Sequence, residues 1–355
     1  MEYKRLGDIA TYINGYAFKP EQWSNKGKPI IRIQNLNNKD AEYNYFDGEI
    51  DEKYLIKKGD VLISWSASIG VYEWDLEDAY LNQHIFKVVF DKEEIDKKYF
   101  KFMVDIALNK AVKYMHGSTM KHITKKYFDN ILVPVPSLDK QKKIAEVLDK
   151  AQYLAEKKRE QIDLLDELVK SRFIEMFGDP ITNSKNLKMK NFEEVIVLQR
   201  GYDLPTYKRD ENGEYNVWGS NGVLSKHSEY KIKEYGVITG RSGSLGNVYY
   251  TKEPYWPLNT TLFSKDTCGN NVVYLTYLLR FYDLKRFSNG TGVPTLNRNL
   301  LNGQKIIDVP IELQNEFAEF VTKTDSIRSK METSLSELED NFNSLMQKAF
   351  KGELF

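Results

Sequence analysis

Two stretches of this chain place hydrophobic residues at alternating steps of three and four positions for about 40 residues each, a spacing typical of paired helices. They occupy residues 136–177 and 310–352, and no glycine or proline interrupts the first stretch after Ser137. Each stretch predicts one helix about 60 Å long, because an α-helix rises by about 1.5 Å per residue. Ser137 can cap the first helix at its N-terminus, and Gly178 and Gly352 stand where C-terminal caps belong.

Each of these helices needs a partner for its apolar stripe. One interpretation is that each helix covers only its own domain, but about 40 residues exceeds the length of an ordinary helix and outruns a domain of about 130 residues. Two matching stripes supply each other's partner. We therefore predict an antiparallel coiled coil, and a pseudo-two-fold molecule with one globular head at each end of a helical rod.

The chain is one module written twice, because residues 15–177 match residues 201–350 motif by motif. The longest matched motif is VLISWSASIG at residues 61–70, which corresponds to VITGRSGSLG at residues 237–246. The other matches are Gly15-Tyr16 with Gly201-Tyr202, Leu81-Asn82 with Leu258-Asn259, Phe86 with Phe263, and Gln141 with Gln314. A repeat of about 20 to 50 residues would indicate a solenoid, so a unit this long is a whole domain with its connector.

The heads have a mixed α and β pattern, so the predicted fold class is α+β. Short alternating or aromatic-rich runs predict strands at residues 29–34, 61–65, 84–90, 195–199 and 247–251. Amphipathic runs predict one helix per head, at residues 99–115 and 272–287. The predicted domains are a first head at 1–135, a long helix at 136–177, a linker at 178–190, a second head at 191–309 and a second long helix at 310–352.

Composition indicates a soluble cytoplasmic protein without a bound metal. A chain of 355 residues with 41% hydrophobic content is long enough for two cores. A single cysteine, Cys268, excludes an internal disulfide and fits a reducing compartment. No apolar run approaches the roughly 18 residues that a membrane span requires, and the N-terminus lacks a signal sequence. The four histidines have no cysteine or carboxylate at metal-ligand spacing.

Motifs for catalysis are missing, which predicts a non-catalytic chain. Gly240, Gly243 and Gly246 are not followed by the Gly-Lys-Ser/Thr of a phosphate-binding loop. A methyltransferase acting on exocyclic nitrogen needs an Asn/Asp-Pro-Pro-aromatic loop, and the nearest match, EPYW at residues 253–256, has one proline too few and the wrong acid. The serine-containing motif around Ser66 is better explained as a Gly/Ser turn between strands than as a nucleophile, because the matched histidines are absent.

Charge distribution favours a nucleic-acid partner. The formal net charge is zero and the isoelectric point is about 6.9, unlike a typical basic nucleic-acid-binding domain. Locally, residues 109–128 and the matched residues 284–305 are rich in lysine and arginine and contain no acid. Such a run is often only a solvated face. Both copies, however, also place small Gly, Ser or Thr residues there, which let backbone N–H groups approach a phosphate.

The chain resembles the specificity subunit of type I restriction-modification systems over essentially its whole length. The resemblance is carried by KPIIRIQNL at 28–36 with KGDVLIS at 58–64, by EYNVWGSNGVL at 214–224 with residues 237–246 and YWPLNTT at 255–261, and by VPVP at 133–136 with Gln141, echoed by Val309-Pro310 with Gln314. Each piece is weak alone, and the ordered, duplicated set is specific. Compared with longer relatives, this chain begins almost directly with its first head at Lys4.

The resemblance implies a non-catalytic subunit with two target recognition domains, each reading one half of a bipartite site in double-stranded DNA. It implies that the paired helices set the spacer and dock the modification (methyltransferase) subunits, two of them, and that restriction/translocase subunits also assemble. S-adenosylmethionine and ATP with Mg would be bound by those partners and no cofactor by this chain. Because residues 31–35 and 217–221 differ, the two half-sites should differ.

Candidate base and phosphate contacts are polar side chains in predicted loops. In the first head they are Arg32, Asn35, Trp65, Ser66, Gln83, His84, Ser118, Thr119, Lys121 and Lys125. In the second head they are Arg200, Tyr202, Ser220, Asn221, Arg241, Ser242, Asn259, Thr260, Thr291, Thr295, Asn297 and Arg298. Arginine can fork onto guanine, and asparagine or glutamine onto adenine.

Structural roles compete with these assignments. Trp65 and Tyr202 fit core aromatic positions, Asn221 and Asn259 fit turns, and Arg32 fits an ion pair with a neighbouring carboxylate. Two other functions also stay open: a recognition fragment of a fused nuclease-methyltransferase, and a non-catalytic coiled-coil protein adaptor.

Overall fold

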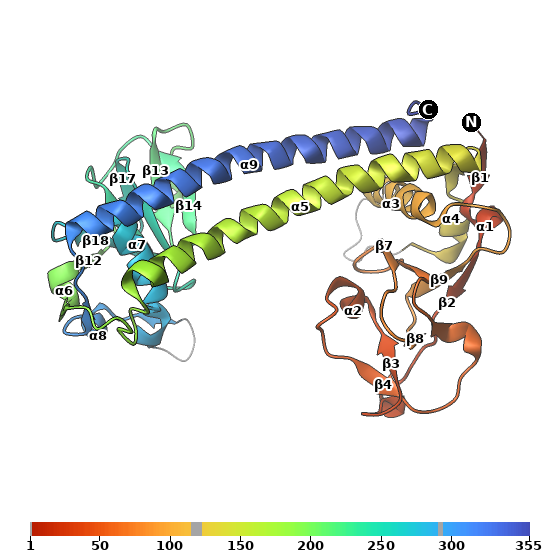
Figure 1. Ribbon diagram of the computed structural model, residues 1–355, viewed down its shortest axis with the longest axis horizontal. Helices are drawn as coiled ribbons and strands as arrows, with labels where there is room; N and C mark the ends of the chain where they lie inside the picture. Colours follow the sequence, from red (N-terminus) through yellow and green to blue (C-terminus); the bar gives the residue numbers. More distant parts are fainter. Residues whose placement is uncertain (1, 115–122, 290–293) are drawn as a thin grey trace. The chain divides into compact units, whose positions relative to one another are not determined.

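The protein consists of two compact units, each built from a head and from parts of both long helices (Figure 1). The structure is a computed structural model, and it describes residues 2–114, 123–289 and 294–355. Unit 1 comprises Met1–Arg159 with Ser334–Phe355, and unit 2 comprises Glu160–Thr333. Both units therefore take their cores partly from the two long helices.

The two long helices are α5 (Leu138–Phe177), of 40 residues, and α9 (Ile311–Lys351), of 41 residues, which confirms the predicted helix lengths. Both end as the sequence predicts. Gly178 and Gly352 have φ angles of 75° and 77°, a left-handed backbone that glycine adopts without steric cost. The Gly178 N–H donates to the carbonyl of Ile174 at 2.8 Å and so satisfies one of the last carbonyls of α5.

Within each unit, α5 and α9 run antiparallel. In unit 2, Asp166 of α5 pairs with Arg328 of α9 at 2.5 Å, and Arg172 pairs with Glu316 at 2.8 Å, so a later residue on α5 meets an earlier one on α9. Exposed ion pairs of this kind contribute at most about 1 kcal/mol each. Burial of the apolar stripe, which includes Phe173 at 0% exposure, is the larger stabilising effect.

The described residues of unit 1 form two four-stranded sheets and one two-stranded sheet. The first, in spatial order, is β2 (Thr11–Asn14), β9 (Ile85–Val89), β6 (Val61–Ser64) and β7 (Gly70–Glu73), all antiparallel. The second is β4 (Asn44–Phe46), β3 (Lys28–Ile31), β8 (Ala79–Leu81) and β5 (Leu55–Ile56), with β3 and β8 parallel. The third pairs β1 (Tyr3–Arg5) with β10 (Leu132–Pro134).

Unit 2 repeats this topology, which confirms the duplication. Its four-stranded sheet is β12 (Val197–Arg200), β18 (Thr261–Asp266), β15 (Gly236–Gly240) and β16 (Val248–Thr251). Its second sheet is β14 (Gly222–His227), β13 (Tyr215–Gly219) and β17 (Tyr255–Pro257), again with one parallel pair, β13 with β17. Two-stranded sheets pair β11 (Met189–Asn191) with β21 (Lys305–Ile307) and β19 (Ser288–Asn289) with β20 (Thr295–Leu296).

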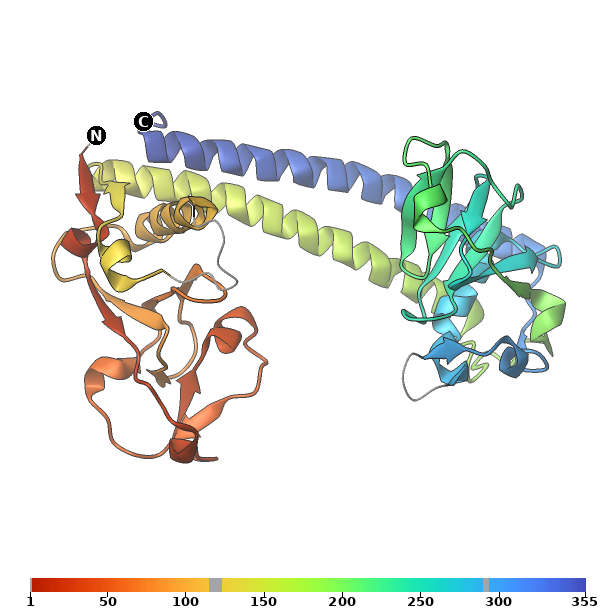
Figure 2. The same cartoon turned by 180° about the vertical axis from the view of Figure 1, so that it is seen from behind.

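Each head has one principal helix beside the long helices, α3 (Lys97–Tyr114) in unit 1 and α7 (Val272–Phe281) in unit 2 (Figure 2). The prediction for unit 2 was six residues too long, because Asp283 takes a left-handed φ of 52° and a separate 3-10 turn, η4 (Leu284–Phe287), follows. The shorter helices are α1 (Leu6–Ile9), α4 (Lys125–Asp129), α6 (Phe192–Val195) and α8 (Arg298–Leu301). Three further 3-10 turns are η1 (Pro20–Gln22), η2 (Glu52–Tyr54) and η3 (Thr206–Lys208). None of the helices in the described ranges combines the length and apolar composition needed to span a bilayer.

One predicted strand is partly wrong. Residues 29–34 were expected to be extended, but β3 ends at Ile31 and a short helix, α2 (Ile33–Asn37), follows. The change of direction is fixed by Asn35, whose side-chain oxygen accepts from the Arg32 N–H at 3.1 Å while its amide donates to the carbonyl of Glu42 at 3.2 Å. Alternating hydrophobicity alone does not reveal such a side-chain-to-backbone bond.

The repeated glycines Gly15 and Gly201 mark a close backbone approach. A Cβ at Gly15 would lie 2.0 Å from the carbonyl oxygen of Asn82, and one at Gly201 would lie 2.2 Å from that of Leu258. Only glycine tolerates this approach. Because Asn82 and Leu258 occupy the same place, the predicted match of Leu81-Asn82 with Leu258-Asn259 was displaced by one residue.

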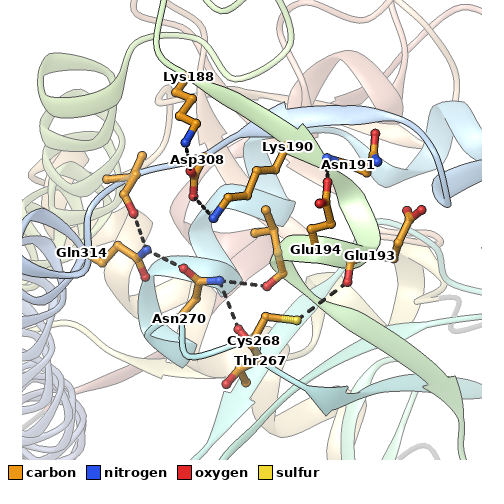
Figure 3. A network of polar contacts seen from close by, with 12 residues as sticks. Lys188, Lys190, Asn191, Glu193, Glu194, Thr267, Cys268, Asn270, Asp308 and Gln314 are labelled. Atoms are coloured by element: carbon orange, nitrogen blue, oxygen red, sulfur yellow. Dashed lines mark hydrogen bonds and ion pairs between the residues drawn. The ribbon is translucent and has the colours of Figure 1, made fainter.

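The repeated glutamines join the start of each long helix to the head. Gln141 is buried, accepts from the Asp96 N–H at 2.9 Å and donates to the carbonyl of Pro136 at 2.9 Å. Gln314 likewise accepts from the Asn271 N–H at 2.9 Å and donates to the carbonyl of Val309 at 2.7 Å. Figure 3 shows Gln314 together with its side-chain partner Asn270, which it meets at 2.6 Å.

Replacing Gln314 with leucine is expected to lower the free energy of unfolding of unit 2 by about 2 kcal/mol, because a buried N–H and a buried carbonyl would lose their partner. Urea unfolding followed by tryptophan fluorescence measures the change. Leucine at the exposed Gln304 is the matched control and should shift stability by less than about 0.5 kcal/mol. Equal effects at both positions would contradict the role given to Gln314.

Candidate nucleic-acid interface

The two units build the same backbone framework around Trp65 and Arg241. In unit 1 the Trp65 N–H donates to the carbonyl of His84 at 3.3 Å, and the Trp65 carbonyl accepts from the Ile123 N–H at 3.0 Å. In unit 2 the Arg241 N–H donates to the carbonyl of Thr260 at 2.8 Å, and the Arg241 carbonyl accepts from the Leu296 N–H at 2.8 Å. Trp65 and His84 therefore stand where unit 2 has Arg241 and Thr260.

The same correspondence extends to a short helix next to each of these residues. Thr124 caps α4 by accepting from the Tyr127 N–H at 3.3 Å, and Asn297 caps α8 by accepting from the Asn299 N–H at 3.0 Å. The first helical residue is Lys125 in unit 1 and Arg298 in unit 2. A cation is thus placed at the same point of each framework.

In unit 1 the framework carries an aromatic group. The Trp65 ring stacks on Phe86 at a centroid distance of 5.6 Å and meets the edge of His84 at 4.9 Å. Its indole Nε1 donates to Asn14 Oδ1 at 3.2 Å. Lys125 lies close by, with its Nζ 5.8 Å from the Phe86 ring and 2.9 Å from Asp129. Trp65 is partly buried, so it packs as a core aromatic residue and still has part of its side chain exposed.

In unit 2 the framework carries arginines around a hollow of about 340 Å³. Five predicted residues line it: Arg200, Arg241, Thr295, Asn297 and Arg298. The lining contains no acidic residue, and within the described residues Arg200 and Arg241 form no ion pair. Arg298 is held by a bond from Nη1 to the carbonyl of Leu198 at 3.3 Å. The hollow therefore concentrates positive charge and hydrogen-bond donors.

The Gly/Ser turn of unit 2 borders this hollow. Ser242 forms a backbone bridge with Thr295, and a Cβ at Gly240 would lie 2.1 Å from the carbonyl oxygen of Ser244. Ser220 and Asn221 form the two-residue turn between β13 and β14, and Asn221 accepts from the Asn247 side chain at 3.4 Å. This places Asn221 in a turn, one of the two roles expected for it.

Three residues at these two frameworks were not among the predicted contacts. Asn289 and Asn299 line the hollow of unit 2, and Asn14 holds the indole of Trp65. A signal existed for Asn14, because it precedes the repeated Gly-Tyr pair as Arg200 does in the second copy. No sequence signal distinguished Asn289 and Asn299 from the other asparagines of the second head.

Arg32 and Asn35 lie apart from the framework, at the end of β3. The Arg32 Nη1 donates to Asn44 Oδ1 at 3.3 Å, and its guanidinium lies 5.5 Å from the Trp23 ring. Its partners are therefore an amide and an aromatic ring, and not the carboxylate of the alternative structural role. Asn35 is 0% exposed and uses both ends of its amide to hold the chain. Its side chain is not available to read a base, which corrects that prediction.

Several of the remaining predicted residues lie beside the close backbone contacts of Gly15 and Gly201. Gln83 and Asn259 are equivalent, because their N–H groups donate to the carbonyls of Tyr16 and Tyr202 at 2.9 and 3.0 Å. The Asn259 side chain donates to the carboxylate of Asp203, and the Tyr202 ring lies 5.9 Å from that of Phe263. Both therefore also have a structural role. Ser66 directly follows Trp65, and its carbonyl accepts from Ser64 Oγ at 3.2 Å. Ser118, Thr119, Lys121 and Thr291 lie outside the described residues.

The described residues offer donors and rings for recognition. They contain no group of three or more side chains able to hold a metal ion. Burial raises the pKa of the Cys268 thiol, and a thiol that stays protonated is a poor nucleophile.

Comparison with known proteins gives consistent results. The family model for the type I restriction modification DNA specificity domain matches residues 1–164 and 184–340. The EcoBI specificity subunit of Escherichia coli is 24% identical over 205 residues, 57% of this chain and 42% of that protein. The MjaVIII specificity subunit of Methanocaldococcus jannaschii is 22% identical over 367 residues, 99% of this chain and 76% of that protein. The match to the EcoBI subunit thus spans less than half of its length.

Among solved structures, the S subunit of a type I restriction-modification system from M. genitalium has a similar fold. Its TM-score is 0.61 at 16% identity, and the match covers 98% of this chain and 96% of that one.

Proposed function

Because this chain belongs to the family of type I restriction modification DNA specificity domains, we propose that it is the DNA-recognition subunit of such a system and reads a bipartite, asymmetric target. One head would contact each half-site of double-stranded DNA. The chain itself would carry out no chemistry. This proposal goes beyond family membership in assigning the two heads to two different half-sites.

The observation that carries this proposal is one backbone framework bearing different side chains. Trp65 and His84 in unit 1 are replaced by Arg241 and Thr260 in unit 2, and Asn14 is replaced by Arg200. A shared framework presents its side chains to DNA in the same manner, while different donors and acceptors select different base edges. Two heads of this kind favour two unlike half-sites.

The cations at the helix starts favour a phosphate role. Lys125 and Arg298 occupy the same position in the two units, so their common positive charge supplies attraction without selectivity. Both lie within stretches of sequence that contain no acid, and Lys125 pairs with Asp129, which directly follows its stretch. The zero net charge of the whole chain fits a subunit that shares contact with the DNA backbone with its partners.

Replacing Lys125 with alanine is expected to weaken DNA binding by a similar factor for all sequences and to reduce the slope of log affinity against log salt by about 1. Binding titrations on target and scrambled duplexes at several salt concentrations measure both quantities. Lys58, an exposed lysine outside the acid-free loops, is the control position. A loss confined to the target duplex would show that Lys125 reads a base.

The partners follow from the same proposal. Two methyltransferase subunits would dock on the long helices and supply S-adenosylmethionine, and restriction subunits would supply ATP-driven translocation. Exposed apolar side chains along α5, such as Leu164 and Leu168, support a docking role for this helix.

The test is to co-express this chain with its methyltransferase subunit in a host without its own modification and to map methylated bases by single-molecule sequencing. A new bipartite motif with two unlike halves and an unread spacer is the expected result. Cells with the methyltransferase subunit alone serve as the control. A stable complex without new methylation would instead favour a protein adaptor.

A further inference from the structure

Unit 1 contains a hollow of about 870 Å³ where α3 meets α5 and α9. Its lining includes Val71 of β7, Phe102 and Asp105 of α3, and Met346 of α9. Figures 1 and 2 both show α3 beside the first part of α5. The size is within the range of ordinary ligand sites, about 300 to 1,000 Å³. The candidate DNA-contacting residues do not line it.

The duplication identifies what fills the corresponding place in unit 2. The buried glutamines bind Asp96 before α3 and Asn271 before α7, so Asp105 is equivalent to Arg280. In the sheets, Val71 pairs with Ile63 as Val248 pairs with Thr239, so Val71 is equivalent to Val248. The residues around the hollow can therefore be compared one by one.

In unit 2 this place is occupied by an arginine. The Arg280 Nε donates to the carbonyl of Val248 at 2.9 Å, and its guanidinium lies 4.7 Å from the centroid of the Tyr277 ring. The backbone carbonyl and the aromatic ring form a seat for a guanidinium group.

Unit 1 keeps the seat and lacks the arginine. Phe102 replaces Tyr277, and Val71 replaces Val248. Asp105 stands in place of the arginine, but its side chain is too short to reach the carbonyl of Val71. When ionised, it can accept hydrogen bonds but cannot donate them. The Asn109 side-chain amide donates to the Asp105 carboxylate at 3.1 Å. Burial raises the pKa of Asp105, so its charged form is inadequately compensated.

After its ion pairs are counted, the hollow keeps unpaired negative charge. Four cations on its lining already have acidic partners: Lys98 with Asp149, Lys101 with Glu73, Lys150 with Glu146, and Arg159 with Glu339. Glu156 accepts from the Gln152 amide at 2.8 Å. Within the described part of the chain, Asp105 and Glu156 have no ion pair, so the hollow favours a cation.

We propose that this hollow binds an arginine side chain of a partner protein, which takes the place that Arg280 holds in unit 2. The guanidinium would pair with Asp105, donate to the carbonyl of Val71 and stack on Phe102. The volume leaves room for residues on either side of that arginine. This site concerns a protein partner and does not depend on DNA recognition.

The probe is N-acetyl-arginine amide, titrated into the full chain labelled with carbon-13 at the methionine methyl groups. Met346 lines the hollow and reports occupancy, and its signal is assigned with the Met346→Leu variant. N-acetyl-citrulline amide has the same shape without the charge. We expect a saturable shift of the Met346 signal with affinity at least tenfold greater for the arginine probe. No shift, or equal shifts with both probes, would overturn the proposal.

Two substitutions at Asp105 separate binding from folding. Asp105→Asn should weaken the arginine probe at least tenfold and leave the other methionine signals unchanged. Asp105→Arg should place a guanidinium in the seat from within, raise the melting temperature and abolish binding. Undiminished binding by a folded Asp105→Arg protein would show that the probe binds elsewhere and would exclude this site.

Discussion

Replacing Phe173 with alanine is expected to lower the free energy of unfolding of unit 2 by about 4 kcal/mol, because truncating a buried phenylalanine removes apolar contact and leaves a cavity. Phe173 is fully buried, and its ring lies 5.0 Å from Phe177, 5.4 Å from Phe317 and 4.8 Å from Phe281. It therefore joins α5, α9 and α7. Native-state hydrogen exchange of α7 and β12 measures the change within unit 2.

Leu164 offers a control on the same helix. Its side chain is 64% exposed, so Leu164→Ala should change stability by less than about 0.5 kcal/mol. Equally fast exchange in both variants would show that burial of Phe173 is not what stabilises unit 2, because alanine favours the helix at both positions. Protection that survives in Phe173→Ala would show that the aromatic cluster does not hold unit 2 together.

Replacing Arg241 with alanine is expected to relax the preference for one base of one half-site by about 10- to 100-fold, since a bidentate contact discriminates by about 1 to 3 kcal/mol. Arg241 is held by two backbone bonds and lies with Arg200 in a hollow without acids. The main chain at position 241 is therefore fixed, and no acidic residue of the hollow neutralises the guanidinium. The measurement is the methylated motif, or duplex binding across all substitutions of the target.

Trp65→Ala provides the comparison, because Trp65 holds the equivalent position in unit 1. It should alter only the other half-site. An equal loss of affinity for every sequence in Arg241→Ala, with a smaller salt slope, would assign Arg241 to a phosphate. Unchanged binding by both measures would remove it from the interface.

The long helices were predictable because their signal is periodic. A stripe repeated over about 40 residues averages out single exceptions, and Gly178 and Gly352 define the ends by a backbone conformation that glycine favours. The duplication was predictable for a related reason. Gly15, Gly201, Gln141 and Gln314 each satisfy a backbone requirement that recurs in both units.

The candidate site was only partly predictable, because its residues are brought together by hydrogen bonds between distant backbone groups. Arg200, Arg241 and Arg298 come from three separate segments and share one hollow. Asn35 has the composition of a base-reading residue, yet its burial assigns it to the turn. Polarity in a predicted loop does not tell whether an amide faces solvent or the chain itself.

The predicted match of the two Leu-Asn pairs was wrong, because the same two residue types recur by coincidence at neighbouring positions. Leu-Asn occurs in both copies, but the backbone bonds displace the second pair by one position. Because strands alternate their faces, a one-residue error exchanges buried and exposed positions. The backbone hydrogen bonds establish the correct correspondence between the two copies, which the residue types alone did not.

The framework around Trp65 and Arg241 is held by main-chain groups, and this bears on how such a chain changes over generations. A substitution at position 241 keeps both bonds unless it introduces proline, which lacks the N–H that donates to Thr260. Most mutations there would leave these bonds intact and, under the role proposed for Arg241, would change only its contact with DNA. Because the fold depends on main-chain bonds here and the DNA preference on side chains, the two can change independently. Single substitutions can therefore give a new target sequence while every intermediate protein still folds.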